Sequence, residues 1–451
     1  MGLIEQIRDA GIVGCGGAGF PTHVKLNCKV EYLIVNAAEC EPLLRTDRYL
    51  MLNKANEIVS AVEMVAEMTQ AKELYIALKE TYTEEIAALS TAIATKNSKV
   101  KLFCLKNFYP AGDEQIMVLE VTGKTVPPSG IPLDVGAVVS NVATMYGIYQ
   151  ASNGIPFTDK YLTVTGAVKS PTIIKTPIGT SFKECIEAAG GATVSDYHIL
   201  AGGPLMGKLY KKEDLDKYYV TKTTSGIVIV PDEANLVQMR EASLHQILKR
   251  AKGACIQCQT CTSMCPRYLS GHPLSPHKIM RKLAYIDDVN EILEDKDIKE
   301  AMTCSECGVC EAYACPMGLA PRQVNVYVKK ALRESGFRYQ KNTSIAYTKR
   351  EDREYRRIPS HRIAARLGVE QYYDYTIRSL IELEPKEVRI PLSQHIGAPS
   401  EATVTTGAVV SKGDLIGRIP EKALGANIHA SISGKIKSIF DGMVVIEREM
   451  H

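Results

Sequence analysis

Two groups of closely spaced cysteines lie between residues 255 and 315. The first reads Cys255-x2-Cys258-x2-Cys261-x3-Cys265-Pro266, and the second reads Cys304-x2-Cys307-x2-Cys310-x4-Cys315-Pro316. Thiolates three positions apart on a tight loop can bind three corners of one iron–sulfur cube. Structural zinc sites instead use pairs of Cys-x2-Cys with tetrahedral closure, so a third cysteine at the same step followed by Cys-Pro disfavours zinc. The spacing therefore predicts two [4Fe–4S] clusters and a chain that carries electrons.

The two runs have the spacing of a bacterial two-cluster ferredoxin, in which the fourth cysteine of each run binds the other cluster. One cluster would take Cys255, Cys258, Cys261 and Cys315, and the other Cys304, Cys307, Cys310 and Cys265. The second run has one residue more before its last cysteine. The exchange of the fourth cysteines between the two clusters is therefore less certain than the membership of the first three. For the nearby His272 and His277 we expect surface or capping roles, because eight thiolates already complete two cubes.

The composition sets broad limits on the chain. A length of 451 residues corresponds to about three or four domains. A net charge of +3 neither indicates nor excludes binding to nucleic acid. No window of the sequence approaches the ~18 consecutive apolar residues of a membrane span. The N-terminus does not look like a signal peptide, which disfavours disulfides and favours a reducing cytoplasm.

Residues 1–155 alternate strand and helix signals. Apolar runs at 33–35, 74–78 and 100–105 predict strands, and the periodicity of 49–69 and 84–95 predicts helices. This order indicates an α/β domain with a mainly parallel sheet, in which ligands bind at the carboxyl ends of the strands.

A glycine-rich motif, GCGGAGFPT over residues 14–22, is followed by Lys25. It contains G-x-G-x-x-G, but a helix precedes it and Phe-Pro follows, so it does not fit the strand–loop–helix context of a Rossmann loop. Glycines this dense still let backbone N–H groups approach a phosphate, whose charge Lys25 can neutralise. A flexible loop without a ligand is the alternative.

Two further motifs follow predicted strands. NAAECEP over residues 36–42 places two acids at a strand end, where they can bind ribose hydroxyls, or form a solvated acidic turn. YPAGDE over 109–114 leads to SNVAT over 140–144. Tyr109 offers a ring that can stack on a planar cofactor, and Asn141 and Thr144 offer hydrogen bonds.

In this order the motifs resemble those of the flavoprotein subunit of respiratory NADH dehydrogenases, where FMN and NADH share the glycine loop. The resemblance implies FMN contacts at Gly14, Gly16, Lys25, Asn36, Glu39, Tyr109, Gly112, Asp113, Ser140, Asn141 and Thr144. It implies NADH contacts at Gly17, Phe20, Lys25, Glu41 and Glu114. Ala38 stands where that family has an acid, which puts one FMN contact in doubt. The ECEP and NVAT variants are those of the Rnf-complex C subunit and its relatives.

The rest of the chain divides into four parts, so the fold class is multidomain α/β and α+β. Residues 156–235 resemble a soluble-ligand-binding β-grasp (SLBB) domain, expected here as a spacer. Residues 236–335 form the helical dicluster ferredoxin-like domain, and residues 336–386 a basic connector. Residues 387–451 resemble the barrel-sandwich domain of lipoyl carriers, expected unmodified because the hairpin at 431–436 lacks their lysine patterns.

Residues 322–366 carry 13 Lys and Arg against 4 Asp and Glu. Because no nucleic-acid reading motif accompanies them, we expect a solvated connector or a docking face for an acidic partner protein. Arg353, Arg356 and Arg357 would then steer the electron acceptor.

The position of the barrel-sandwich domain separates two families. In the Rnf C subunit a module with the same His-Ile-Gly-Ala-Pro run stands at the N-terminus, whereas here it occupies residues 395–399. With this order, the length and the Cys-Pro-Arg267 context, nearly the whole chain resembles the propanediol-utilisation cobalamin reductases of the PduS type. The resemblance implies a cytoplasmic enzyme inside a bacterial microcompartment, with a shell protein or an adenosyltransferase as further partners.

The predicted parts form an electron path. NADH gives up two electrons as a hydride, whereas each cluster accepts one, so a flavin between them must divide the pair. The path would run from NADH through FMN and both clusters to a corrinoid, and it needs no catalytic acid or nucleophile. No corrinoid-binding motif such as Asp-x-His-x2-Gly occurs. An Rnf-like subunit that delivers electrons to a protein partner, or a ferredoxin-type carrier with a vestigial flavin site, are the alternatives.

Overall fold

The computed structural model describes residues 2–286 and 288–448. The first sheet is parallel, in the order β3-β2-β1-β4, with strands Lys101–Leu105, Glu73–Lys79, Tyr32–Asn36 and Ala137–Asn141. The helices of this domain are α1 (Leu3–Asp9), α2 (Thr22–Lys25), α3 (Thr46–Asn53), α4 (Ala55–Thr69), α5 (Thr83–Thr95), α6 (Glu114–Thr122) and α7 (Val142–Ser152), with a 3₁₀ turn at Pro132–Val135. The predicted α/β fold is confirmed.

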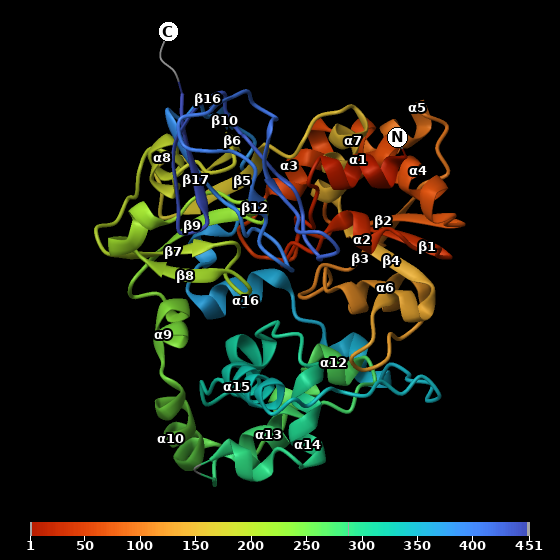
Figure 1. The fold of residues 1–451 in the computed structure, drawn as a ribbon. Helices are drawn as coiled ribbons and strands as arrows, with labels where there is room; N and C mark the ends of the chain where they lie inside the picture. Colours follow the sequence, from red (N-terminus) through yellow and green to blue (C-terminus); the bar gives the residue numbers. More distant parts are fainter. Residues whose placement is uncertain (1, 287, 449–451) are drawn as a thin grey trace.

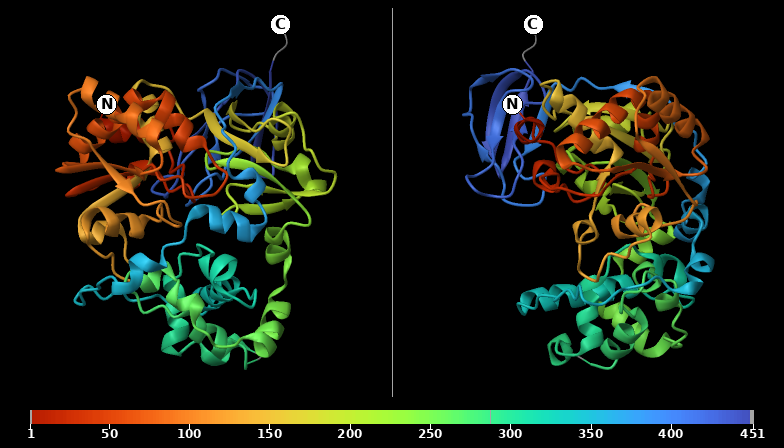
Figure 2. Two further views of the ribbon diagram at one scale, coloured as in Figure 1. Left: turned by 180° about the vertical axis from the view of Figure 1, so that it is seen from behind. Right: turned by 90° about the vertical axis from the view of Figure 1, so that its right-hand side faces the viewer.

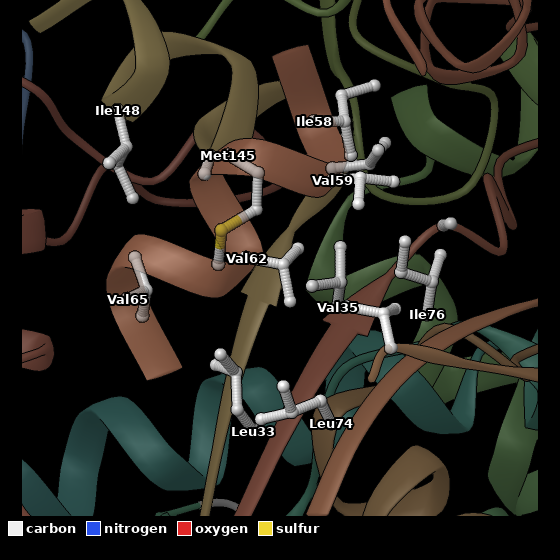
Figure 3. Packing of buried hydrophobic residues seen from close by; sticks show 14 of the residues in the cluster. Leu33, Val35, Ile58, Val59, Val62, Val65, Leu74, Ile76, Met145 and Ile148 are labelled. Carbon is white, nitrogen blue, oxygen red and sulfur yellow. The ribbon is translucent and has the colours of Figure 1, made fainter. Parts of the chain in front are cut away.

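The two faces of this sheet pack against different helices. Leu33 and Val35 point to the layer of α4 and α7, where they meet Val62 and Met145 (Figure 3). Ile34 points the opposite way, into the cluster formed with α6. Because successive side chains of a strand alternate between faces, both faces of β1 are apolar, as is typical of a parallel sheet covered on two sides.

The second sheet is mixed, in the order β10-β6-β5-β9-β7-β8. Its strands are β5 (Asp159–Gly166), β6 (Thr172–Pro177), β7 (Tyr197–Ala201), β8 (Lys208–Lys211), β9 (Gly226–Pro231) and β10 (Leu380–Glu382), with helix α8 (Phe182–Ala188) and a 3₁₀ turn at Lys212–Lys217. Strand β10 pairs in parallel with β6. The segment expected as a connector therefore adds an edge strand to the β-grasp domain.

The helical region below these sheets in Figure 1 carries the cysteines. It contains α9 (Asn235–Glu241), α10 (Leu244–Ala254), α11 (Thr260–Ser263), α12 (Pro266–Leu269), α13 (Pro276–Leu283), α14 (Lys296–Lys299) and α15 (Pro321–Glu334), with 3₁₀ turns at Val289–Ile292 and Glu300–Thr303. Residues Cys310–Ala314 form a π turn, in which the Cys315 N–H donates to the Cys310 carbonyl at 3.1 Å. This wider turn accommodates the extra residue of the second cysteine run. Within the described ranges no helix is long and apolar enough to cross a membrane.

The C-terminal domain consists of two small sheets, β11-β17-β16-β13 and β12-β14-β15, around one apolar core. The strands are Glu387–Pro391, Glu401–Ala402, Val409–Val410, Leu415–Arg418, Ile428–His429, Gly434–Phe440 and Met443–Glu447 for β11 to β17. This arrangement confirms the barrel-sandwich fold. The domain lies beside the N-terminal segment (Figure 2), and the Ile396 N–H donates to the Gly19 carbonyl at 3.3 Å.

Within the basic run of residues 322–366, several side chains such as Lys330, Arg333 and Arg362 are exposed, but two of the three arginines expected to steer an acceptor are turned to the first domain. Arg353 is 5% exposed, and both Arg353 and Arg357 bind Glu120 of α6. Of the three arginines expected to steer an acceptor, Arg356 alone is exposed, and it pairs with Asp352 of its own turn. The connector holds 3₁₀ turns at Glu351–Arg356 and Glu370–Tyr372 and helix α16 (Ser360–Leu367). Arg353 and Arg357 hold the connector to the first domain.

A buried lysine joins three domains. Lys222 is 1% exposed, and its Nζ donates to the carbonyls of Gly11 at 2.7 Å and of Asn427 at 2.6 Å. These carbonyls belong to the first domain and to the barrel-sandwich domain. Its backbone N–H donates to Gln394 Oε1 at 2.9 Å. Burial lowers the pKa of Lys222 to about 7, because charged ammonium groups are costly to desolvate.

Replacing Lys222 with Met tests this joint. Between about pH 7 and its usual pKa of 10.5, the folded protein has released a proton that the unfolded chain still holds, so the stability contributed by Lys222 rises with pH in this window. We expect the thermal midpoint of the unaltered protein to rise relative to K222M as pH increases, measured anaerobically by scanning calorimetry. A pH-independent difference, equal to that of the exposed control K217M, would contradict this expectation.

Candidate functional site

Segments far apart in the sequence meet at the carboxyl ends of β1 and β4. Asn36 and Asn141, the last residues of these strands, are register partners. Asn36 Nδ2 donates to the Gly112 carbonyl at 2.8 Å, and Asn141 Oδ1 caps α7 by accepting the Ala143 N–H at 2.9 Å. The adjacent Ser140 is buried in β4. The second and third sequence motifs thus share the edge at which ligands of parallel sheets bind.

The glycine loop lies on this edge. A bridge between Val13 and Pro21 closes it, and the Cys15 N–H donates to Thr144 Oγ1 at 3.0 Å. A Cβ at Gly16 would lie 3.1 Å from side-chain atoms of Asn141, whereas a Cβ at Gly17 would stand in open space. The loop therefore leaves one side free for a ligand and requires a glycine on the other.

One cation stands beside the loop. Lys25 Nζ lies 2.6 Å from Glu114 Oε1, and both side chains are partly exposed. Phe20 is 37% exposed at the end of the loop. A half-open cradle of glycines with one lysine suits an anionic phosphate, so these residues fit the FMN and NADH that the sequence predicts.

Two carboxyl groups lie behind the cradle. Glu39 accepts the N–H groups of Asp47 and Arg48 at 3.0 and 3.3 Å, and Asp47 accepts Asn141 Nδ2 at 2.8 Å. Burial raises the pKa of Glu39 to about 7, with a further contribution from the charge of Asp47, and it raises the pKa of Asp47 to about 6. Near neutral pH these two carboxyl groups are therefore partly protonated. A protonated carboxyl can donate a hydrogen bond to a ligand.

Three of the predicted ligand residues face neighbouring domains instead. Tyr109 is 3% exposed and its hydroxyl donates to the Cys307 carbonyl at 2.7 Å, so its ring does not lie open for stacking. Glu41 accepts the N–H groups of Leu205 and Met206, both at 2.8 Å. Burial raises the pKa of Glu41. Tyr109 and Glu41 thus connect the edge of the first sheet where the flavin site is predicted, here called the flavin edge, to the helical region and the β-grasp domain.

Asp113 makes the strongest contact of this kind. It caps α6, and its two carboxylate oxygens accept from the two Arg267 Nη atoms at 2.7 and 2.9 Å. Both side chains are about one-tenth exposed. No structural role of Arg267 is predicted from the sequence, although its position directly after Cys265-Pro266 is a signal that could have indicated one.

The two cysteine loops repeat one backbone geometry. Left-handed residues stand at Gln257 (φ 55°) and Gln259 (φ 62°) in the first loop, and at Glu306 (φ 60°) and Gly308 (φ 81°) in the second. These positions are equivalent with respect to the cysteines of each run. The two loops therefore turn in the same way around their first three cysteines.

Hydrogen-bond donors surround the sulfur atoms. Gln257 Nε2 donates to Cys255 Sγ at 3.1 Å, and Thr260 Oγ1 donates to Cys258 Sγ at 3.2 Å. The Thr260 hydroxyl lowers the pKa of Cys258. In the second run the backbone N–H groups of Glu306 and Leu319 donate to Cys304 and Cys315, both at 3.4 Å. Donors to sulfur are a feature of iron–sulfur sites, so these residues fit such clusters.

The thiols form two sets of neighbours. Burial raises the pKa of Cys261 to about 12, and the next contributions come from Cys315, Cys258 and Cys255. Burial likewise raises the pKa of Cys310, whose thiol neighbours are Cys304, Cys307 and Cys265. These sets have the membership that the spacing predicts. In the described part of the chain no three His, Cys, Asp or Glu side chains are arranged to hold a metal ion, so the eight cluster ligands stay a prediction.

The two histidines near the array have structural partners. His277 Nδ1 lies 2.7 Å from Thr262 Oγ1, in keeping with a capping role. His272 is 1% exposed and its Nε2 donates to the Val126 carbonyl at 2.9 Å. The expectation of a surface role is therefore wrong for His272. Its side chain is buried and connects the helical region to the first domain.

Known families match each part of this architecture. Residues 7–150 match the Nuo51 FMN-binding domain, 161–209 the SLBB domain, 254–320 the 4Fe-4S dicluster domain and 374–451 the RnfC barrel sandwich hybrid domain. The chain is therefore a flavin-linked iron–sulfur protein that carries FMN and two [4Fe–4S] clusters. This confirms the predicted cofactors.

Comparison with curated proteins gives the particular family. The chain is 41% identical over 447 residues to cobalamin reductase PduS of Salmonella typhimurium, covering 98% of this chain and 96% of that protein. It is 39% identical to cobalamin reductase PduS of Citrobacter freundii, with the same coverage. The C subunit of a proton-translocating ferredoxin:NAD(+) oxidoreductase complex of Clostridium ljungdahlii is 35% identical over 60% of this chain and 57% of that protein. The chain belongs to the PduS family.

Substitutions in the glycine loop test the cradle. We expect Gly16→Ala to lower the FMN content of the purified protein, because its Cβ would displace Asn141, which lies 3.1 Å away. Gly17→Ala is the matched control: its Cβ meets open space, so FMN content should persist while the KM for NADH rises. FMN is measured by absorbance after denaturation. Equal flavin loss in both variants would contradict this division of the loop.

A second prediction concerns the buried acids. Because the pKa values of Glu39 and Asp47 are raised to about 7 and about 6, both carboxyls gain negative charge as pH rises past these values. We expect the flavin-free protein to bind anionic FMN more weakly as pH increases from about 6 to about 8, followed by quenching of flavin fluorescence. Glu39→Gln should flatten this dependence, whereas Glu67→Gln, on the exposed side of α4, should leave it unchanged.

Proposed function

We propose that the chain is an NADH-dependent oxidoreductase that passes electrons through FMN and two [4Fe–4S] clusters to a corrinoid, as a cobalamin reductase. The observation that supports this most is the 41% identity over 98% of the chain to a cobalamin reductase. FMN supplies the chemistry that converts a two-electron donor into one-electron steps. The protein supplies binding, alignment and exclusion of water.

The chain's own residues have distinct roles in this proposal. The glycine loop and Lys25 bind the phosphates, Asn36 and Asn141 fix the flavin edge, and the Glu39–Asp47 pair adjusts local charge. The eight cysteines at 255, 258, 261, 265, 304, 307, 310 and 315 hold the clusters. We assign no residue to acid–base or nucleophilic catalysis, since hydride and electron transfer depend on alignment and distance.

We infer the cellular location and the partner proteins from membership of the same family. A corrinoid reductase restores the reduced cofactor that a corrinoid-dependent enzyme consumes, so we place this protein in the cytoplasm, inside a bacterial microcompartment. A shell protein and an adenosyltransferase are the partners that such a location suggests. The alternative, an Rnf-like subunit that reduces a protein partner, is supported by the 35% identity to the Clostridium protein, but over 60% of the chain.

The test uses anaerobically purified protein with about eight irons and one FMN per chain. NADH is added with cob(III)alamin or cob(II)alamin, and the corrinoid absorbance is followed. We expect NADH-dependent corrinoid reduction that falls more than tenfold in Cys258→Ala and persists in Cys104→Ser, an exposed thiol outside the array. Dye reduction without any corrinoid reduction would overturn the corrinoid proposal and favour a protein acceptor.

A further inference from the structure

The two predicted clusters differ in their contacts with the flavin domain. Arg267, two positions after Cys265, forms the paired hydrogen bonds with Asp113. The Tyr109 hydroxyl binds the carbonyl of Cys307. Both contacts reach the set Cys265, Cys304, Cys307 and Cys310, which we call the proximal set. Two residues of one flavin-site motif therefore bind two loops of a single cluster site.

The apolar packing has the same asymmetry. Tyr109 and Cys40 of the flavin edge share a hydrophobic cluster with Val309, Ala312 and Cys307 of the second cysteine loop. Among the described residues, no hydrogen bond or ion pair joins the loop of residues 255–261 to the flavin domain. Packing and hydrogen bonds thus hold one cluster site at the flavin edge.

The other set, Cys255, Cys258, Cys261 and Cys315, is called the distal set, and it has one exposed member, although Cys315 is buried and Cys255 and Cys261 are partly buried. Cys258 is exposed, and Ile256 between the first two cysteines is 62% exposed. In the proximal set, Cys265 and Cys310 are buried and the other two are partly buried. An electron acceptor can therefore approach the distal set from outside.

We infer that the proximal set holds the cluster that receives electrons from the flavin, that the distal set holds the cluster that delivers them, and that Arg267 is a positioning residue that fixes the proximal loop against Asp113. This inference depends on the proposed electron path, but not on the identity of the acceptor. For each NADH oxidised, NAD⁺ and a proton are released and two electrons cross the proximal set one after the other. Two one-electron reductions of the acceptor complete the balance.

The Asp113–Arg267 pair also gives the proximal site its own electrostatic surroundings. Arg267 lies two residues after Cys265, and its ion-pair partner Asp113 belongs to the same motif as Tyr109, whose hydroxyl binds the Cys307 carbonyl. Net charge and hydrogen bonds near the sulfurs set cluster potentials. Removal of the Asp113 charge should therefore change the potential of one cluster and leave the other unchanged.

The order is tested with ligand variants under anaerobic conditions, after iron and flavin contents have been measured. NADH is added without any acceptor, and the reduced clusters are observed by EPR spectroscopy. We expect Cys258→Ser to keep an NADH-reducible proximal signal. In Cys304→Ser, NADH should still bleach the flavin while the distal signal forms more than tenfold more slowly. Rapid distal reduction in Cys304→Ser, together with loss of proximal reduction in Cys258→Ser, would reverse the order and overturn the inference.

A second measurement covers the case in which a ligand variant loses both clusters. Asp113→Asn keeps the cap of α6 and a hydrogen bond to Arg267, but removes one negative charge. In a redox titration followed by EPR, we expect the proximal midpoint potential to rise by about the 59 mV of a tenfold change in a one-electron equilibrium. The distal potential should stay constant, and Asp134→Asn, which also loses a capping carboxylate paired with a lysine, should change neither. A shift confined to the distal signal, or none at all, would overturn the assignment.

Lysine at position 267 separates positioning from charge. Arg267→Lys keeps the cation, but it cannot form the two parallel hydrogen bonds to Asp113. A positioning role predicts slower flavin-to-cluster electron transfer by stopped-flow absorbance, with nearly unchanged iron and FMN contents. Unchanged transfer with unchanged contents would contradict that role.

Discussion

Electron transfer requires that two cofactor sites be held at a fixed distance, and here a buried ion pair contributes most to that constraint. Asp113 caps a helix of the flavin domain, while Arg267 is the second residue of the short helix α12, which follows Cys265. Breaking such a buried pair costs about 3–5 kcal/mol, more than an exposed salt bridge contributes. The contact therefore resists the separation of two domains that would otherwise move independently.

A second contact involves all three of the domains around the site. The loop at residues 203–206 of the β-grasp domain donates two N–H groups to Glu41, while its carbonyls accept from Arg240 and Arg322. Arg322 is also paired with Glu311 of the π turn. A Cβ at Gly203 would lie 2.3 Å from Glu41 atoms, so only glycine permits this approach. This loop of the β-grasp domain thus contacts both the first domain and the helical region, and its role as a spacer stays a prediction.

Local spacing explains most of what could be predicted from the sequence. The cysteine runs, the glycine loop and the strand-end motifs are each encoded within about a dozen residues, and the structure gathers them where a parallel sheet requires. Contacts between distant segments could not be predicted. Tyr109 is expected from the sequence to stack on a cofactor, but its hydroxyl reaches Cys307. Two of the three arginines expected to face a partner, Arg353 and Arg357, bind Glu120. No local pattern specifies which distant surface will cover a side chain.

The cysteine runs illustrate the same limit. Their spacing predicts two sets of four, and the extra residue before Cys315 leaves the pairing open. The π turn at Cys310–Ala314 accommodates this residue, but the pairing stays a prediction. The contacts of Arg267 and Lys222 could not be predicted, because local sequence does not show which distant groups a buried charge will meet. Its partners, a carboxylate and two carbonyls respectively, come from segments more than 100 residues away.

The position of the barrel-sandwich domain has a consequence for how the molecule is made. The Gly19 carbonyl of the glycine loop is bound by Ile396, and the lysine joint closes on Asn427. During synthesis the first domain can fold long before these residues leave the ribosome. The contacts of residues 396 and 427 with the glycine loop and with Lys222 therefore form only after both cysteine runs have been translated. Docking of the barrel-sandwich domain is thus a late step in the folding of the chain.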